Sequence, residues 1–238
     1  MKIEEPDLTA NYSYADYLKW QLPEMVELIQ GKIFKMSPAP NSLHQKVSLE
    51  LSRQIANFLK GKKCQAFTAP FDVRLPNSAE ENKDHEILTV VQPDICVVCD
   101  ISKIDEQGCL GAPDWVIEIL SRFTSSKDLR NKFDVYEKSG VREYWVVHPA
   151  EQTVLVYILE NGKYKSKKPY IKEDILPSVT IPHLAINLKE VFEEDWILKT
   201  LPHEYRVLSI DYQSKNTHQL VFAIWNPTIF QTWCNPVR

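Results

Sequence analysis

Three things are scarce in this 238-residue chain: glycine, long hydrophobic runs and an excess of positive charge. With 6 glycines against 44% hydrophobic and 25% charged residues, the composition is that of a globular protein and excludes a low-complexity chain. No apolar run reaches the roughly 20 residues of a membrane-spanning helix, so we expect no membrane partner. The first residues, MKIEEPDL, are acidic, unlike a signal peptide, and we therefore expect a cytoplasmic protein.

Cysteine is present in a number and arrangement that predict no disulfide framework. The 5 cysteines form an odd set in a chain without an export signal. Cys96 and Cys99 have the C-x-x-C spacing of many zinc sites, but residues three apart on a strand point to opposite faces. The sequence also offers no second C-x-x-C or Cys/His cluster to complete four zinc ligands. We interpret the pair as apolar strand residues and keep zinc as the weakest alternative.

The charge is low and unevenly distributed. A formal net charge of −4 argues against the wholly basic surface of a tight, nonspecific nucleic-acid binder. Basic residues nevertheless gather at residues 163–168 and at Arg122, Lys127, Arg130, Lys132, Lys138 and Arg142. Such patches can bind phosphates, although a run of charge is more often a solvated face.

The hydrophobic pattern predicts a mixed sheet flanked by helices, within the α/β class (α+β, mixed sheet). Apolar residues recur with helical spacing over residues 44–60, and Gly61 ends that segment. Strands rich in β-branched and aromatic residues are predicted at 65–75, 90–99 and 114–120. A second helix is predicted over 126–138, with a capping box at Ser125 and Asp128 and with Gly140 after its end.

Shorter elements flank this central pattern. Ser13 and Asp16 have capping-box spacing, which predicts a short helix, and Gly31 marks the turn of an early hairpin. A strand near 142–149 is followed by a hairpin turned at Asn161-Gly162, and a last short helix lies near 188–196. Residues beyond about 196 carry no comparable pattern.

Two acidic residues occupy predicted apolar strands. Glu118 lies in the middle of Pro113–Ser121, and Asp94 repeats the situation on the preceding strand. An isolated buried carboxylate is costly, so it needs a cation, a basic side chain or a metal as its partner. Carboxylates on adjacent strands could converge on one hard divalent ion, which can polarise a phosphodiester. An ion pair inside the core is the alternative for Glu118.

A basic group near these carboxylates would complete a hydrolytic site. Position 120, on the same strand face as Glu118, is leucine, so the strand itself supplies no lysine. Lys132 lies beside the buried stripe of the following helix and could reach the sheet, although it could equally be an exposed partner of Asp128. His44 falls on the apolar stripe of the first long helix, either as a site residue or as a helix-start histidine.

Several motifs in the same order resemble the Uma-type family of putative restriction endonucleases, in the PD-(D/E)XK nuclease superfamily. The likeness covers roughly residues 13–195. The matching stretches are residues 27–31, His44-Gln45, 92–99, 111–121, 127–132, Tyr136 and 140–149.

The resemblance implies a restriction-endonuclease-like fold and Mg²⁺-dependent (or Mn²⁺-dependent) hydrolysis of phosphodiester bonds, with DNA as the usual substrate. It implies that Asp94 and Glu118 bind the metal, that Lys132 is the catalytic lysine moved from strand to helix, and that Glu27 is a candidate third acidic ligand. Asp114 is a spare candidate that also suits a strand entry. No organic cofactor is implied.

The resemblance also leads to expectations about the domains, the oligomeric state and the alternative function. Residues 1–196 are expected to form the nuclease domain and 197–238 a C-terminal extension of unknown role. A homodimer is plausible, since cutting both strands of a duplex often uses two sites. The main alternative is a catalytically inactive module on the same fold that binds nucleic acid or protein.

Overall fold

The computed structural model describes residues 7, 9–20, 22, 25–36, 41–78, 83–121 and 126–193. The chain divides into two units, residues 1–192 and 193–238, and every described helix and strand lies in the first. The predicted domain boundary at 196 and the capping box at Ser125 fall outside the described residues. None of the described helices combines the length and apolar character needed to cross a membrane.

The helices agree closely with the predicted ones. They are α1 (Tyr14–Tyr17), α2 (Ser42–Leu59), α3 (Ser126–Ser139) and α4 (Leu188–Val191), with a 3-10 turn, η1 (Ile101–Lys103). The Ser13 and Asp16 capping box forms at the start of α1. Asn41 caps α2 by accepting a hydrogen bond from the main chain of His44. Gly140 follows α3 with φ of 88°, a conformation that glycine adopts without the cost of a Cβ atom.

A seven-stranded mixed sheet forms the centre of the fold. Its order is β12 (Lys163–Ser166), β11 (Thr153–Glu160), β10 (Glu143–His148), β9 (Trp115–Ile119), β6 (Ile95–Val98) and β3 (Gln65–Thr68), with β13 (Tyr170–Ile171) also paired to β11. Strands β9 and β10 are parallel, and the other pairs are antiparallel. The predicted hairpin at Asn161-Gly162 joins β11 to β12.

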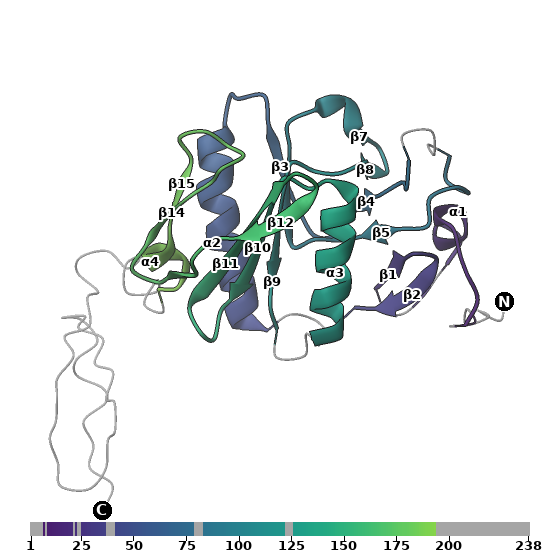
Figure 1. The fold of residues 1–238 in the computed structure, drawn as a ribbon, viewed down its shortest axis with the longest axis horizontal. Helices are drawn as coiled ribbons and strands as arrows, with labels where there is room; N and C mark the ends of the chain where they lie inside the picture. The colour runs from purple at the N-terminus through teal and green to yellow at the C-terminus, as the bar shows by residue number, and fades with distance from the viewer. Residues whose placement is uncertain are drawn as a thin grey trace, which may run out of the picture. The chain divides into compact units, whose positions relative to one another are not determined.

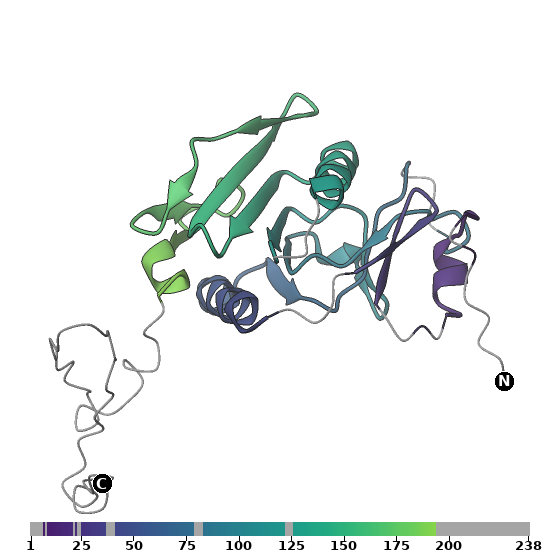
Figure 2. The same ribbon diagram turned by 90° about the horizontal axis from the view of Figure 1, so that it is seen from below.

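Helices α2 and α3 cover opposite faces of this sheet (Figure 1 and Figure 2). Trp115, Ile117 and Ile119 of β9 pack in one buried cluster with the apolar stripe of α2. Val116, between them, packs in a second cluster with Tyr136 of α3. Alternate residues of a strand point to opposite faces, so position 118 faces α3.

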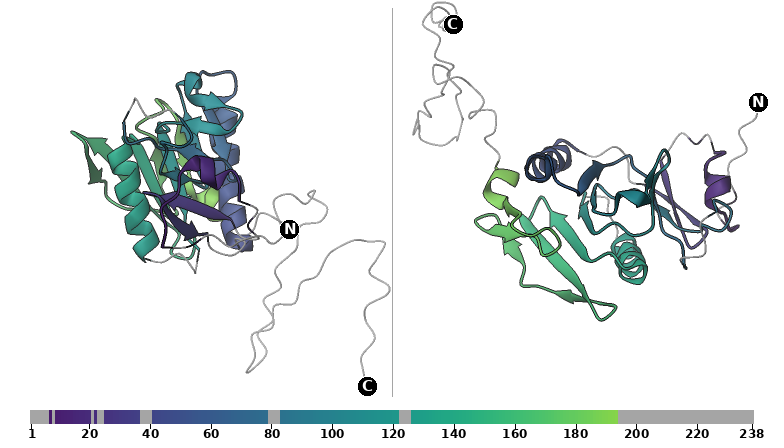
Figure 3. Two further views of the ribbon diagram at one scale, coloured as in Figure 1. Left: turned by 90° about the vertical axis from the view of Figure 1, so that its right-hand side faces the viewer. Right: turned by 90° about the horizontal axis from the view of Figure 1, so that it is seen from above.

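A six-stranded sheet lies beside the first. Its order is β2 (Lys32–Lys35), β1 (Val26–Ile29), β5 (Val90–Val91), β4 (Val73–Arg74), β8 (Gly108–Leu110) and β7 (Ile104–Asp105). The predicted hairpin at Gly31 joins β1 to β2. A separate pair, β14 (Ile175–Pro177) and β15 (Ala185–Asn187), lies with α4 at the end of the unit away from α1, β1 and β2 (Figure 1 and Figure 3).

Two predicted strands are each divided between the two sheets. The predicted strand 65–75 is β3 and β4, and the predicted strand 90–99 is β5 and β6. Each division contains a proline, Pro70 or Pro93, which lacks the N–H that a strand donates to its neighbour. Asp94 therefore lies where the chain passes from one sheet to the other.

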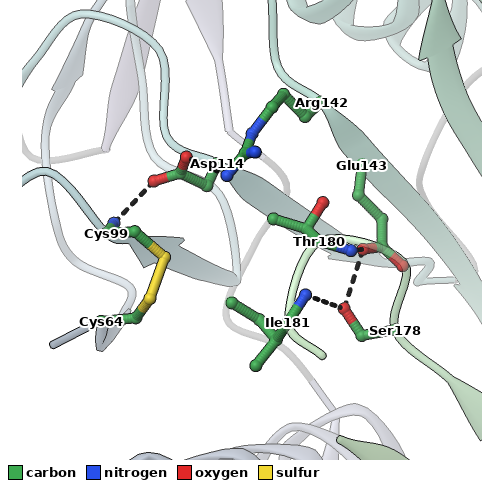
Figure 4. Close-up of a disulfide and its surroundings, with 8 residues drawn as sticks. All are labelled: Cys64, Cys99, Asp114, Arg142, Glu143, Ser178, Thr180 and Ile181. Atoms are coloured by element: carbon green, nitrogen blue, oxygen red, sulfur yellow. Dashed lines mark hydrogen bonds and ion pairs between the residues drawn. A yellow bond between two sulfur atoms is a disulfide. The ribbon is translucent and has the colours of Figure 1, made fainter. Parts of the chain in front are cut away.

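The prediction that cysteines form no disulfide is wrong for one pair. The sulfur atoms of Cys64 and Cys99 are joined at 2.06 Å, and Figure 4 shows the bridge between β3 and β6. The antiparallel register pairs Gln65 with Val98, so one further residue on each strand brings these cysteines opposite each other. Cys96 is a buried free thiol in the cluster under α3, so the zinc alternative for Cys96 and Cys99 is not supported.

Candidate active site

Glu118 is a buried carboxylate between the central sheet and α3. Its Oε1 atom accepts a hydrogen bond from the ammonium group of Lys132 at 2.9 Å and another from the hydroxyl of Tyr136 at 2.6 Å. Lys132 and Tyr136 are one helical turn apart and therefore project from the same side of α3. The structure thus brings together Glu118 and Lys132, which the sequence singled out, with Tyr136, to which the sequence analysis assigned no role in the site.

Lys132 also joins the two sheets. Its ammonium nitrogen lies 2.9 Å from Oε1 of Glu27, which belongs to β1 of the six-stranded sheet. The same oxygen of Glu27 accepts a hydrogen bond from the main-chain N–H of Gln92 at 2.8 Å. The exposed fraction is 15% for the Lys132 side chain and 6% for that of Glu27, so this ion pair is screened little by solvent. Lys132 is therefore not the exposed partner of Asp128 that the sequence also allowed.

Asp94 lies next to Glu118 across the strands. The antiparallel register of β6 and β9 pairs Ile95 with Ile117, and its continuation by one residue brings Asp94 opposite Glu118. The main-chain N–H of Ile119 donates to Oδ2 of Asp94 at 2.7 Å. With 21% of its side chain exposed, Asp94 is more open to solvent than the two glutamates.

His44 joins the site through Asp94. Its Nε2 atom lies 3.3 Å from Oδ1 of Asp94, and its Nδ1 atom is buried without a hydrogen-bond partner among the described residues. Burial lowers the pKa of His44, but the hydrogen bond and charge of Asp94, with smaller contributions from the Ile119 main chain and the charge of Glu118, together outweigh that effect, so the net pKa is raised. The start of α2 therefore contributes a histidine to the same region.

The electrostatics of the site reflect a local excess of acid. Burial raises the pKa of Glu118 to about 7, against the opposing effect of Lys132, and the charges of Asp94 and Glu27 raise it further. Burial lowers the pKa of Lys132, but the two glutamates outweigh it, so the pKa is raised and the ammonium stays protonated. Burial beside Glu118 also raises the pKa of Tyr136 well above its ordinary value.

The donor atoms fit a hard divalent ion with an incomplete protein shell. Within the described ranges, no three His, Cys, Asp or Glu side chains converge closely enough to enclose a metal by themselves. Mg²⁺ commonly takes one or two carboxylates and completes its shell with water and phosphate oxygens. The acidic groups here are all carboxylates, which suit Mg²⁺ or Mn²⁺ better than a thiolate-seeking ion.

Among the described residues, each glutamate has one oxygen atom without a partner. Lys132 and Tyr136 both contact Oε1 of Glu118, and Lys132 and the Gln92 main chain both contact Oε1 of Glu27. No described residue forms a hydrogen bond or ion pair with either Oε2 atom. These Oε2 atoms are therefore the ones that a cation could bind without displacing an existing partner.

Asp114, the spare candidate, is held away from this cluster. Its Oδ2 accepts a hydrogen bond from the main chain of Cys99 at 2.6 Å, and its Oδ1 pairs with Arg142 at 2.5 Å (Figure 4). It precedes Glu118 by four residues, which is roughly 13 Å along a strand. Its contacts fix the entry of β9, which is the structural role that the sequence also allowed.

Sequence reasoning missed three groups that hold the carboxylates. They are the Tyr136 hydroxyl and the main-chain N–H groups of Gln92 and Ile119. The spacing of four residues from Lys132 to Tyr136 was the available signal for the first, because it places both on one side of a helix. Main-chain donors carry no signature in a sequence.

The chain is similar to known proteins over most of its first unit. It matches the Uma2 family, described as “Putative restriction endonuclease”, over residues 14–189. The crystal structure of a putative nuclease belonging to DUF820 from Anabaena variabilis matches with a TM-score of 0.57 and 26% identity, covering 76% of this chain and 97% of that one. An uncharacterized protein of Synechocystis sp. is 24% identical over 145 residues, 60% of this chain and 71% of that protein.

These comparisons confirm the family and the mixed α+β, nuclease-like fold that the sequence predicted. The family match begins at α1 and ends within α4, so it includes the positions of Glu27, Asp94, Glu118 and Lys132. It covers well over half of the chain. This protein therefore belongs to the Uma2 family of putative restriction endonucleases.

Proposed function

We propose that this protein is a Mg²⁺- or Mn²⁺-dependent endonuclease that hydrolyses phosphodiester bonds in DNA. The observation that carries the proposal is the local excess of acid: Glu27 and Glu118 share one ammonium group, that of Lys132, and Asp94 lies opposite Glu118 on the adjacent strand. Two of these carboxylates have less than a tenth of their side chain exposed. Buried negative charge is costly unless a cation offsets it, which supports a divalent ion as the ligand of this site.

The proposed roles follow from the contacts of each residue. Asp94 and Glu118 would hold the ion, with Glu27 as a further acidic ligand from the other sheet. When bound, such an ion polarises the phosphodiester and stabilises the charge that develops on it. An ammonium group has three N–H donors, and Lys132 uses two of them on the glutamates. The third can orient a water or a phosphate oxygen, and the positive charge offsets the negative charge of the transition state.

DNA is the proposed substrate because the family description and the nuclease relative both point to nucleic-acid cleavage. Three exposed lysines of the basic stretch 163–168, namely Lys165, Lys167 and Lys168, are available for phosphate contacts despite the net charge of −4. We also propose that the protein is cytoplasmic, where it would meet chromosomal or invading DNA. Residues 1–196 are the proposed catalytic domain. A homodimer stays a prediction.

Calorimetric titration of Mg²⁺ or Mn²⁺ into the metal-free protein tests the proposal. We expect saturable binding by the wild type, and binding at least about tenfold weaker in Asp94→Asn, because the amide keeps the shape of the side chain and removes its charge. A matched control is Asp114→Asn, the same substitution at the carboxylate that holds the entry of β9. It should leave ion binding unchanged.

Two results would count against this function. Absence of ion binding by the wild type, or equal binding by wild type and Asp94→Asn, would favour the catalytically inactive module instead. Ion binding without cleavage of any nucleic acid would contradict the nuclease role while leaving the metal site in place.

A further inference from the structure

Tyr136 occupies a special position beside the site, because its hydroxyl contacts the same oxygen of Glu118 as Lys132 does. The hydroxyl donates to Oε1 at 2.6 Å and the ammonium lies at 2.9 Å. Both donors come from α3, one turn apart, and Tyr136 has no measurable solvent exposure. Two donors on one oxygen fix the rotation of the carboxylate about its last bond.

The surroundings of Tyr136 hold its ring in place. The ring lies 5.1 Å from that of Tyr144, and both belong to the buried cluster between α3 and the central sheet. A tyrosine so packed has few alternative rotamers, so its hydroxyl is directed at Glu118 before any ligand arrives. The hydroxyl therefore acts as a fixed donor to Glu118.

Glu27 has the same arrangement on the other side of Lys132. Its Oε1 atom also receives two donors, the ammonium of Lys132 and the main-chain N–H of Gln92. Within the described part of the chain, Oε2 of neither glutamate has a donor. The shared pattern is one oxygen held by the protein and one presented for a ligand.

We propose that Tyr136 is a positioning residue, which holds Oε1 of Glu118 so that Oε2 is presented to the divalent ion. This inference rests on the proposed function, because it assigns the ion to the same site. Groups that orient a metal ligand from outside the coordination shell typically contribute a factor of about 10 to 100 in metal affinity or activity.

The test compares Tyr136→Phe with Tyr144→Phe. Both substitutions remove one buried hydroxyl and keep the ring, but the Tyr144 hydroxyl has no hydrogen-bond partner among the described residues. Mn²⁺ affinity is measured by calorimetry, and the melting temperature is measured without metal. We expect Tyr136→Phe to bind Mn²⁺ about 10-fold more weakly or worse, and Tyr144→Phe to bind like the wild type.

A cleavage assay adds a readout that a purely structural role would not change. In Tyr136→Phe, kcat at limiting Mn²⁺ should fall while KM for DNA stays the same, and raised Mn²⁺ should restore most of the lost rate. Equal Mn²⁺ affinity of Tyr136→Phe and wild type would overturn the inference and leave the proposed function standing. Equal weakening by both variants would also overturn it, since that would reflect packing. A wild type that binds no Mn²⁺ would overturn both proposals.

Discussion

The ammonium nitrogen of Lys132 lies 2.9 Å from Oε1 of Glu118, although the two residues come from a helix and a strand and are 14 positions apart in the sequence. Position 120, directly after β9, is leucine, and the ammonium group beside Glu118 comes from α3. The same ammonium contacts Glu27 of the other sheet. One basic side chain thus connects both sheets and α3 at the candidate active site.

The free energy of unfolding should depend on pH because the carboxyl group of Glu118 is buried. Burial raises the pKa of Glu118 from 4.5 to about 7, so the folded protein keeps a proton that the unfolded chain releases between these values. The contribution of protonated Glu118 to the free energy of unfolding is therefore complete below pH 4.5, and it is lost as the pH rises through 7. We expect the unfolding free energy of the metal-free wild type, relative to that of Glu118→Gln, to fall across this window in urea titrations. A pH-independent difference would contradict the raised pKa.

Removing the ammonium group of Lys132 should destabilise the metal-free protein, because the carboxylates it neutralises would then repel each other. Lys132→Ala leaves Glu27 and Glu118 without their shared cation, and breaking a buried ion pair from one side costs about 3–5 kcal/mol. We expect this loss in metal-free denaturant unfolding, with cleavage abolished and stability partly recovered on adding Mg²⁺. Lys19→Ala, which breaks the exposed pair with Asp16, is the control and should change neither stability nor cleavage measurably. Equal stability of Lys132→Ala and wild type would argue against the ion triad.

Glu143 should matter for stability alone. Its fully buried carboxylate accepts hydrogen bonds from the Trp145 ring, the Ser178 hydroxyl and the main chains of Val179 and Thr180, and so ties β10 to the loop after β14 (Figure 4). Glu143→Gln turns one acceptor into a donor and should lower the unfolding free energy by about 3 kcal/mol. Ion affinity measured below the melting transition should stay at the wild-type value. A loss of ion affinity in the folded variant would show that the loop also shapes the active site.

The Cys64–Cys99 bridge should make stability depend on the redox state. The bridge closes a loop between residues 35 apart, and such a cross-link commonly stabilises a protein by about 2–4 kcal/mol. We expect a reductant to lower the melting temperature of the wild type and to leave that of Cys64→Ser unchanged. If the reductant shifts both proteins equally, or neither, the bridge does not form in solution.

The helices and the acid pair could be predicted from the sequence because their signals are local. The spacing of Val47, Leu51 and Ile55 shows the buried face of α2 directly, and a glutamate inside an apolar strand already signals an unusual partner. Asp94 and Glu118 were named together for the same reason. Their meeting depends only on the pairing of neighbouring strands.

The relationships that cross between sheets could not be predicted in this way. The sequence predicts one continuous strand over 65–75 and another over 90–99, although each is divided between the two sheets. A proline permits a break in a strand but does not determine which sheet the following residues join. The Lys132 contact with Glu27 and the Cys64–Cys99 bridge both depend on that tertiary arrangement. The donor from Gln92 to Glu27 is a main-chain group, which any residue other than proline would supply.

Cleavage of supercoiled plasmid DNA by the wild type and by Glu118→Gln, in EDTA, Mg²⁺ and Mn²⁺, tests the central claim most directly. Glu137→Gln, the same substitution at a carboxylate of α3 that pairs with Lys163 and Tyr164 rather than with the site, serves as the control. We predict nicking by the wild type and Glu137→Gln with either metal and none in EDTA, and a rate at least about 100-fold lower for folded Glu118→Gln. A wild type that leaves the plasmid intact with both metals, or a Glu118→Gln variant that nicks at the wild-type rate, would contradict the account.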